Sequence, residues 1–218
     1  MKNWLASLGL RAQQKPAGTR PLGEGLQSSL ALSVLFRQLR AGRKYNILDL
    51  GPACGSNVDF FSQFSSKIYI EDFYQTLTSF GYLSPEDGIS YEETFEYLFP
   101  YWENTRFDYI IGWDIVNYLE REEFYHLISH LGRFCRPGTC FFSLVSTLEH
   151  IPERPTTFKI IDQERLFYTV NSSVVSSCPQ YAHGDLSQIM PGFRVTNSFL
   201  LRNGFKEYIL VCDRPTAR

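Results

Sequence analysis

The chain has 218 residues, of which 44 % are hydrophobic and 20 % are charged, with a formal net charge of −2. This length suits one domain with a large core, and the composition predicts a soluble globular protein. The acidic balance argues against electrostatic binding of nucleic acid, which needs a basic surface. No apolar run approaches the ~20 residues of a membrane span, and residues 1–11 lack the apolar core of a secretory signal. We therefore expect a cytoplasmic protein without a membrane partner.

Cysteine and histidine spacing predicts neither a disulfide framework nor a metal site. The five cysteines are widely separated, contain no C-x-x-C pair and are odd in number, which favours a reduced interior. His126 and His130 are four residues apart on a predicted helix, which is a spacing used by metal ligands. No third ligand is evident nearby, so we interpret them as part of a solvated helix face and predict no metal.

The N-terminal region is predicted to be an arm followed by a helix. Residues 1–23 contain glycine and proline breaks, and they are equally suited to a flap over a site or a loosely packed terminus. Residues 24–41 carry leucine and valine at helical spacing. We expect residues 1–43 to pack on an α/β domain formed by residues 44–218, with a single domain overall.

The most informative stretch begins with a buried strand and a glycine turn. Ile47, Leu48 and Leu50 form a short apolar run, which is typical of a strand buried on both faces of a parallel sheet. Asp49 interrupts this run. Gly51 and the glycine four residues later let the backbone turn sharply and approach a ligand closely.

A helix and a second strand are predicted to follow this turn. Ser56 and Asp59 have the spacing of a capping box, and three phenylalanines give the helix an apolar side. The next apolar run, residues 68–70, predicts a strand with Glu71 and Asp72 at its carboxyl end.

This arrangement predicts a pocket for an adenosine-like ligand. In open α/β sheets, ligands bind in the crevice outside the carboxyl ends of the strands. An acid at the end of the second strand could accept hydrogen bonds from both ribose hydroxyls. Successive side chains on a strand point in opposite directions, so only one of Glu71 and Asp72 should reach the ribose. The sequence leaves the choice between them open.

The turn itself favours one class of cofactor over another. A dinucleotide site needs G-x-G-x-x-G, but residue 56 is serine, and Pro52 removes an amide donor. The segment instead resembles the D-x-G-x-G-x-G signature of class I S-adenosylmethionine-dependent methyltransferases. Asp49, Gly51 and Gly55 match that signature, and Ala53 replaces its middle glycine.

The remaining elements occur in an order that is also similar to this family. A strand is predicted at residues 107–114, an amphipathic helix at 120–135, and a strand at 139–146 after Arg-Pro-Gly. Residues 195–201 and 205–212 predict a hairpin, because Asn-Gly lies between them. Helices are expected at 73–80 and 185–190, and a third strand with a short helix within 84–106.

The resemblance implies a doubly wound, mostly parallel seven-stranded sheet with a C-terminal antiparallel hairpin and a helical N-terminal extension. It assigns Asp49, Gly51, Ala53 and Gly55 to the methionine end of the cofactor; the alternative for Asp49 is that it ties down its own turn. It places Asp114, at the end of the fourth-strand region, facing the transferring methyl group, together with the asparagine and tyrosine that follow.

The sequence identifies one candidate base. His150 follows the predicted fifth strand and could deprotonate a hydroxyl acceptor, since unperturbed histidine titrates near neutrality. His183 is a weaker candidate in a loop. Many methyltransferases need no base and rely on holding the acceptor in line with the methyl group.

We therefore expect transfer of a methyl group from S-adenosylmethionine to a small-molecule acceptor. The fourth strand is followed by W-D-I-V-N-Y, which matches neither N-P-P-Y nor a Pro-Cys nucleophile. The alternatives are a protein of the same fold that binds or scaffolds without catalysis, and a nucleotide-dependent oxidoreductase. The sequence does not identify the acceptor or the oligomeric state.

Overall fold

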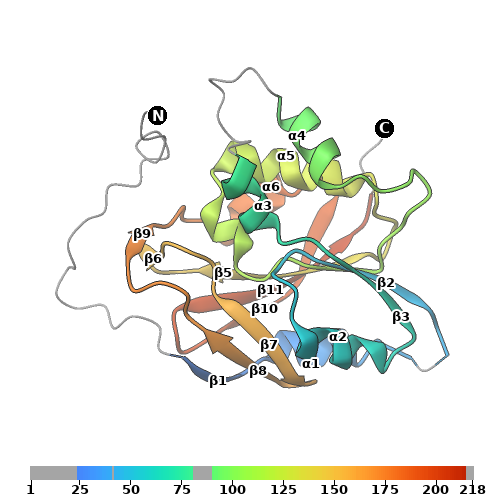
Figure 1. Ribbon diagram of the computed structural model, residues 1–218, viewed down its shortest axis with the longest axis horizontal. Coiled ribbons are helices and arrows are strands. Elements are labelled where there is room, and N and C mark those ends of the chain that lie inside the picture. The colour runs from blue at the N-terminus through green and yellow to red at the C-terminus, as the bar shows by residue number, and fades with distance from the viewer. Residues whose placement is uncertain (1–23, 41, 81–89, 215–218) are drawn as a thin grey trace.

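The computed structural model describes residues 24–40, 42–80 and 90–214, and its centre is a six-stranded mixed sheet in the order β10-β11-β5-β4-β2-β3 (Figure 1). Strands β3, β2, β4 and β5 are mutually parallel, whereas β11 runs antiparallel to β5, and β10 runs antiparallel to β11. The expected C-terminal hairpin is thus confirmed. The strands are β2 (Tyr45–Asp49), β3 (Ser66–Ile70), β4 (Tyr109–Ile111), β5 (Cys140–Ser146), β10 (Phe193–Leu200) and β11 (Phe205–Cys212).

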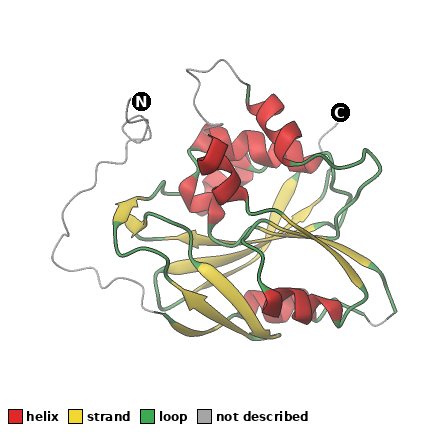
Figure 2. Ribbon diagram, in the orientation of Figure 1, coloured by secondary structure: helices red, strands yellow, loops and turns green. Residues whose placement is uncertain are grey.

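Helices cover both faces of this sheet, as the doubly wound prediction requires (Figure 2). One face packs against α3 (Phe73–Phe80), α4 (Tyr91–Leu98), α5 (Arg121–Gly132) and α6 (His183–Ile189). The other face packs against α1 (Leu30–Phe36) and α2 (Gly55–Ser62). Each face therefore has its own hydrophobic core, and the strands between them are apolar on both sides.

The third strand expected within residues 84–106 does not occur in the described part of that segment, residues 90–106, and the described sheet has six strands where seven were expected. The short helix expected in the same segment is present as α4. Its N-terminus is fixed by a capping box, in which Ser90 Oγ accepts from the Glu93 amide and the Glu93 carboxylate accepts from the Ser90 amide. Phe95 and Leu98 then bury its apolar side. The capping box and apolar spacing together favour a helix over a strand.

The N-terminal part differs from the single helix expected over residues 24–41. Strand β1 (Gly25–Ser28) comes first, and α1 follows with Ser29 as its N-cap. The carboxylate of Glu207, on β11, accepts a hydrogen bond from the Ala31 amide at 3.1 Å. Strand β1 forms because it pairs with β8, which local periodicity could not reveal. The expected arm, residues 1–23, lies outside the described residues.

The segment between β5 and α6 contributes four strands to two small antiparallel sheets that the sequence analysis did not assign. One has the order β1-β8-β7 and the other pairs β6 with β9. Their strands are β6 (His150–Pro152), β7 (Thr157–Asp162), β8 (Arg165–Thr169) and β9 (Val175–Ser177). These strands bring residues far along the chain next to the glycine turn.

Two local expectations were wrong. Helix α2 begins after Cys54, which makes no side-chain cap, so Ser56 and Asp59 do not form a capping box. His130 is buried rather than solvated, and its ring packs against Phe95 and Phe99. Burial lowers the pKa of His130 to about 4, so the ring is neutral near pH 7.

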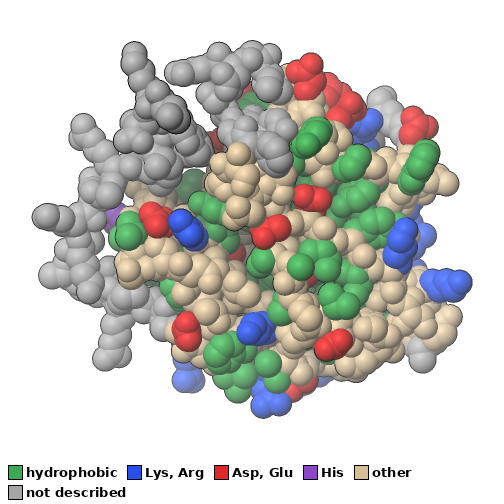
Figure 3. All heavy atoms as spheres, viewed as in Figure 1, with side chains coloured by type: hydrophobic (Ala, Val, Ile, Leu, Met, Phe, Trp, Pro, Cys, Tyr) green, Lys and Arg blue, Asp and Glu red, His purple; other side chains and the backbone are tan. Residues whose placement is uncertain are grey.

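The surface and the cysteines agree with the composition. Positive and negative side chains are interspersed on the described part of the face in Figure 3. All five cysteines are free. Among the described residues, no helix combines the length and the apolar character that crossing a membrane requires.

Candidate functional site

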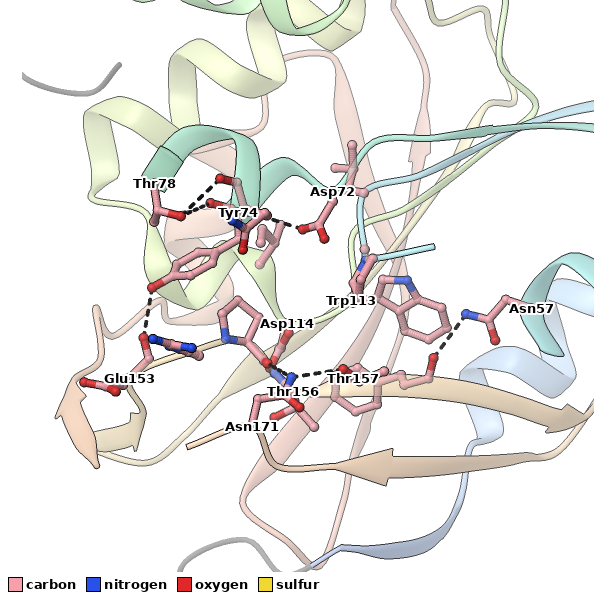
Figure 4. A pocket seen from close by; sticks show the side chains of 18 of the residues that line it. Asn57, Asp72, Tyr74, Thr78, Trp113, Asp114, Glu153, Thr156, Thr157 and Asn171 are labelled. Atoms are coloured by element: carbon pink, nitrogen blue, oxygen red, sulfur yellow. Dashed lines mark hydrogen bonds between the residues drawn. The ribbon is translucent and has the colours of Figure 1, made fainter. Parts of the chain in front are cut away.

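A cavity of about 870 Å³ lies where three parallel strands end (Figure 4). Gly51 follows β2, Asp72 follows β3, and Trp113 and Asp114 follow β4; all four residues line it. This is the edge of the sheet at which open α/β folds bind ligands. A cavity therefore lies at the edge of the sheet where the sequence predicts the pocket.

The opposite wall comes from elements that the sequence analysis did not connect with a site. Tyr74 and Thr78 project from α3, and residues 153–158 lead from β6 into β7. Asn171, after β8, completes this wall. The cavity therefore lies between the main sheet and the segment inserted after β5.

The glycine turn is closed on one side by the Trp113 indole. The Asp49 carboxylate accepts hydrogen bonds from the Trp113 indole N–H at 2.6 Å and from the Gly51 amide at 3.0 Å. A Cβ at Gly51 would lie 2.7 Å from the Trp113 ring, which is too close for a nonbonded contact, so any larger residue at this position would clash with the indole. Trp113 itself has φ of 44°, a left-handed conformation that is uncommon for a bulky residue. The structure thus shows Asp49 holding its own turn.

The environment of Asp49 favours the protonated carboxyl group. Burial raises the pKa of Asp49 to about 6, and the hydrogen bonds from Gly51, Trp113 and Asn57 oppose part of that rise. A buried carboxylate is costly when charged, because the surroundings replace water incompletely.

Asn57 and Trp113 hold the inserted segment against the turn. The Asn57 side chain donates to the Phe158 carbonyl at 3.1 Å and accepts from the Ile160 amide at 2.8 Å. It thus makes the two backbone hydrogen bonds that a neighbouring strand would make at this edge of β7. The Phe158 ring stacks on Trp113 with centroids 5.5 Å apart and planes 8° apart. Strand β7 is therefore fixed to the N-terminal part of α2.

Glu71 and Asp72 have different surroundings. The Asp72 carboxylate lines the cavity and accepts from the Gln75 amide at 3.2 Å, at the start of α3. Glu71 accepts from the Thr76 hydroxyl at 3.3 Å and is not among the cavity-lining residues. Burial raises the pKa of Glu71.

Asp114 is almost completely buried at the inner end of the cavity. Its carboxylate accepts from the Thr156 amide at 3.0 Å, which ties β4 to the inserted segment. Burial raises the pKa of Asp114 to about 7, and the Thr156 hydrogen bond opposes that rise. Asp114 can therefore gain or lose a proton near neutral pH.

The cavity brings together three of the residues predicted for the site. The lining includes Gly51, Asp72 and Asp114. It does not include Asp49, Ala53, Gly55, Glu71 or His150. Gly55 has open space where a Cβ would project, and His150 begins β6.

Sequence reasoning missed the residues that shape the opposite wall. Asn57 looked like an ordinary helix position, and Trp113 like an apolar residue within a buried strand. One signal was present, since an Asn near the start of a helix can bond to a backbone from outside the helix. Residues 153–158 carry no motif that would have marked them. The described residues include no cluster of three or more metal-binding side chains.

Comparison with known proteins gives structural similarity only. No family model and no curated protein matches the chain. Among solved structures, a match is the PH0226 protein of Pyrococcus horikoshii OT3, with a TM-score of 0.47 and 14 % identity over 82 % of this chain and 86 % of that chain. A second is an S-adenosylmethionine-dependent methyltransferase of Clostridium acetobutylicum, with a TM-score of 0.47 and 9 % identity over 83 % and 89 %.

A third match is the 1,6-didemethyltoxoflavin-N1-methyltransferase of Burkholderia thailandensis, with a TM-score of 0.47 and 14 % identity over 84 % of this chain and 77 % of that chain. The last two are methyltransferases by their names, the class that the sequence resembles. At these TM-scores and identities, no residue of this chain takes a role from them.

Proposed function

We propose that the cavity binds S-adenosylmethionine and that the protein transfers its methyl group to a small molecule. The observation that carries the proposal is the cavity at the ends of β2, β3 and β4, with Asp72 in its wall. A volume of about 870 Å³ lies within the range of small-molecule pockets, roughly 300–1,000 Å³, and leaves space beside a nucleoside.

Asp72 is the residue that we propose for the ribose. Its carboxylate stands at the end of the strand next to β2 and faces the cavity (Figure 4). The backbone amide at the start of α3 already orients it, so little further ordering is needed on binding. Hydrogen bonds to a charged group contribute about 1.5–3 kcal/mol.

The charge of the lining suits a cationic ligand. Asp72, Asp114 and Glu153 line the cavity, against the single basic residue Arg154 within the described wall. S-adenosylmethionine would supply an electrophilic methyl group on a sulfonium centre. The walls would hold the acceptor in line with that methyl group and exclude water, which by itself lowers the barrier. His150 does not line the cavity, so the proposed transfer depends on positioning and not on a histidine base.

Binding of S-adenosylhomocysteine, measured by calorimetry or thermal shift, tests the proposal. The melting temperature should rise with ligand concentration, because binding to the folded state alone stabilises it. Asp72→Asn should weaken binding by about tenfold or more, which corresponds to 1.4 kcal/mol. Glu71→Gln is the matched control, since that carboxylate lies outside the wall, and it should bind as the wild type does.

Two results would count against the proposal. If S-adenosylhomocysteine does not bind even at millimolar concentration, S-adenosylmethionine is not the cofactor. Binding without methyl transfer to any of a broad panel of acceptors would instead support the alternative, a non-catalytic protein of the same fold.

A further inference from the structure

The wall opposite Asp72 is a short strap, residues 153–156, whose backbone is held by side chains from three other elements. Tyr74, on α3, donates to the carbonyl of residue 153 at 2.9 Å. Tyr118, in the 3₁₀ helix at Ile115–Tyr118, donates to the carbonyl of residue 154 at 3.0 Å. Asn171 donates to the carbonyl of residue 155 at 2.6 Å. Three consecutive carbonyls are therefore fixed from outside the strap.

Two backbone amides of the strap are fixed as well. The amide of Glu153 donates to the Val174 carbonyl at 2.9 Å, and that of Thr156 donates to the buried Asp114 carboxylate. Irregular segments usually leave such groups to water. The backbone of the strap is therefore fixed at each of its residues, and with it the point from which each of its side chains projects.

The strap carries Arg154, whose guanidinium has no hydrogen bond and no ion pair among the described residues, although it lines the cavity. Several arginines, such as Arg121 and Arg165, pair with acids on the surface, whereas Arg154 is the one arginine among the described residues that line the cavity. The positive charge of Arg154 is close enough to Tyr74 to oppose the rise that burial gives the pKa of that phenol.

We propose that Arg154 binds an anionic group, a carboxylate or a phosphate, on the methyl acceptor. A guanidinium offers a planar fork of N–H donors that matches both groups. Arg154 is an exposed residue that lines the cavity, and its donors have no partner among the described residues. The assignment to the acceptor rests on the proposed function, because Asp72, which lies across the cavity from Glu153 in Figure 4, would hold the cofactor. The substrate class is thus a small anionic molecule.

The anion could also be the carboxylate of the cofactor's own amino-acid end. The two sources share one chemistry and differ in what Arg154 affects. If it holds the acceptor, its loss leaves the affinity for S-adenosylhomocysteine unchanged. If it holds the cofactor, its loss weakens that affinity.

The test uses benzoate and phenyl phosphate as anionic probes and benzamide as the neutral probe of the same shape. Binding is followed by the NMR signal of the Trp113 indole N–H, which lies in the cavity wall. The proteins are the wild type, Arg154→Gln and, as control, Arg202→Gln. Arg202 is exposed near the start of the β10–β11 connection and does not line the cavity. Arg154→Gln should fold normally, because the hydrogen bond that this residue makes with the described part of the chain uses its backbone carbonyl.

We expect an anionic probe to bind the wild type and Arg202→Gln at least about tenfold more tightly than Arg154→Gln, and benzamide to show no such difference. Equal binding of the anionic probes to all three proteins, or no binding to any, would overturn the proposal. Weaker S-adenosylhomocysteine binding by Arg154→Gln would overturn the assignment to the acceptor. If the anionic probes bind through Arg154 but S-adenosylhomocysteine does not bind at all, the anion site stands and the proposed methyl transfer is refuted.

Discussion

The free energy of unfolding of Asp49→Asn, minus that of the wild type, should be larger at neutral pH than at acid pH. The pKa of Asp49 rises from 3.8 to about 6 on folding, mainly through burial. Between these values the folded state keeps a proton that the unfolded state has released, so the free energy of unfolding falls as pH rises. The shift of about two pKa units corresponds to about 3 kcal/mol, at 1.36 kcal/mol per unit.

The amide of the variant cannot ionise and should not show this loss. Its oxygen can still accept from the Gly51 amide and the Trp113 indole, which preserves the turn. The difference in stability, variant minus wild type, should therefore increase by about 3 kcal/mol between about pH 4 and pH 7. The new NH₂ group near Asn57 can destabilise the variant by an amount that does not depend on pH. Such a term shifts the stability difference equally at every pH and leaves its pH dependence unchanged.

Urea denaturation at several pH values measures this difference, provided that the transition is two-state. Other buried acids, such as Asp114, contribute equally to both proteins and cancel. Asp59→Asn is the control, because Asp59 is exposed on α2, and its profile should run parallel to the wild type. A difference between Asp49→Asn and wild type that stays constant from pH 4 to pH 8 would refute the reasoning.

Three further substitutions probe the same region. Trp113→Phe removes the N–H donor to Asp49, which should raise the Asp49 pKa further and destabilise by about 1–3 kcal/mol, more at pH 8 than at pH 5; an equal loss at both would contradict this. Gly51→Ala places a Cβ 2.7 Å from the indole and should cost about 1–3 kcal/mol in urea denaturation, whereas a neutral effect would show that the ring can move. Asn57→Ala should speed hydrogen exchange at the Ile160 amide, and unchanged exchange would rule out the side-chain bond.

The elements of the main sheet could be predicted because each has a local signature. The apolar run before Gly51 gave β2, and Asn203-Gly204 marked the C-terminal hairpin, where Gly204 indeed has φ of 85°. The buried residues Phe124, Leu127, Ile128 and Leu131 followed from helical spacing in α5. In these cases the neighbours along the chain carry enough information.

The strands of the inserted segment could not be predicted, because their partners are distant. Strand β8 pairs with β1, which lies near the start of the described chain, and this pairing turned part of an expected helix into a strand. Strand β7 depends on the Asn57 side chain. Such bonds have no period in the sequence to reveal them.

The candidate site was partly predictable for the same reason. The sequence put the crevice at the strand ends and offered two acids for the ribose, and only the folded chain separated them, with Asp72 in the wall and Glu71 bonded to Thr76. It also left open whether Asp49 meets a ligand or its own turn. The position of Trp113 gives Asp49 a partner within the protein.

By itself, the sequence determined the parallel strands, the glycine turn between β2 and α2 and the edge of the sheet at which a ligand could bind, since these depend on hydrophobic periodicity and backbone freedom within short windows. The tertiary structure alone decided which side chains face that space. Trp113 reaches Asp49 across 64 positions, and Asn57 reaches Ile160 across 103. Contacts over such separations arise when the chain packs, and no local pattern specifies them.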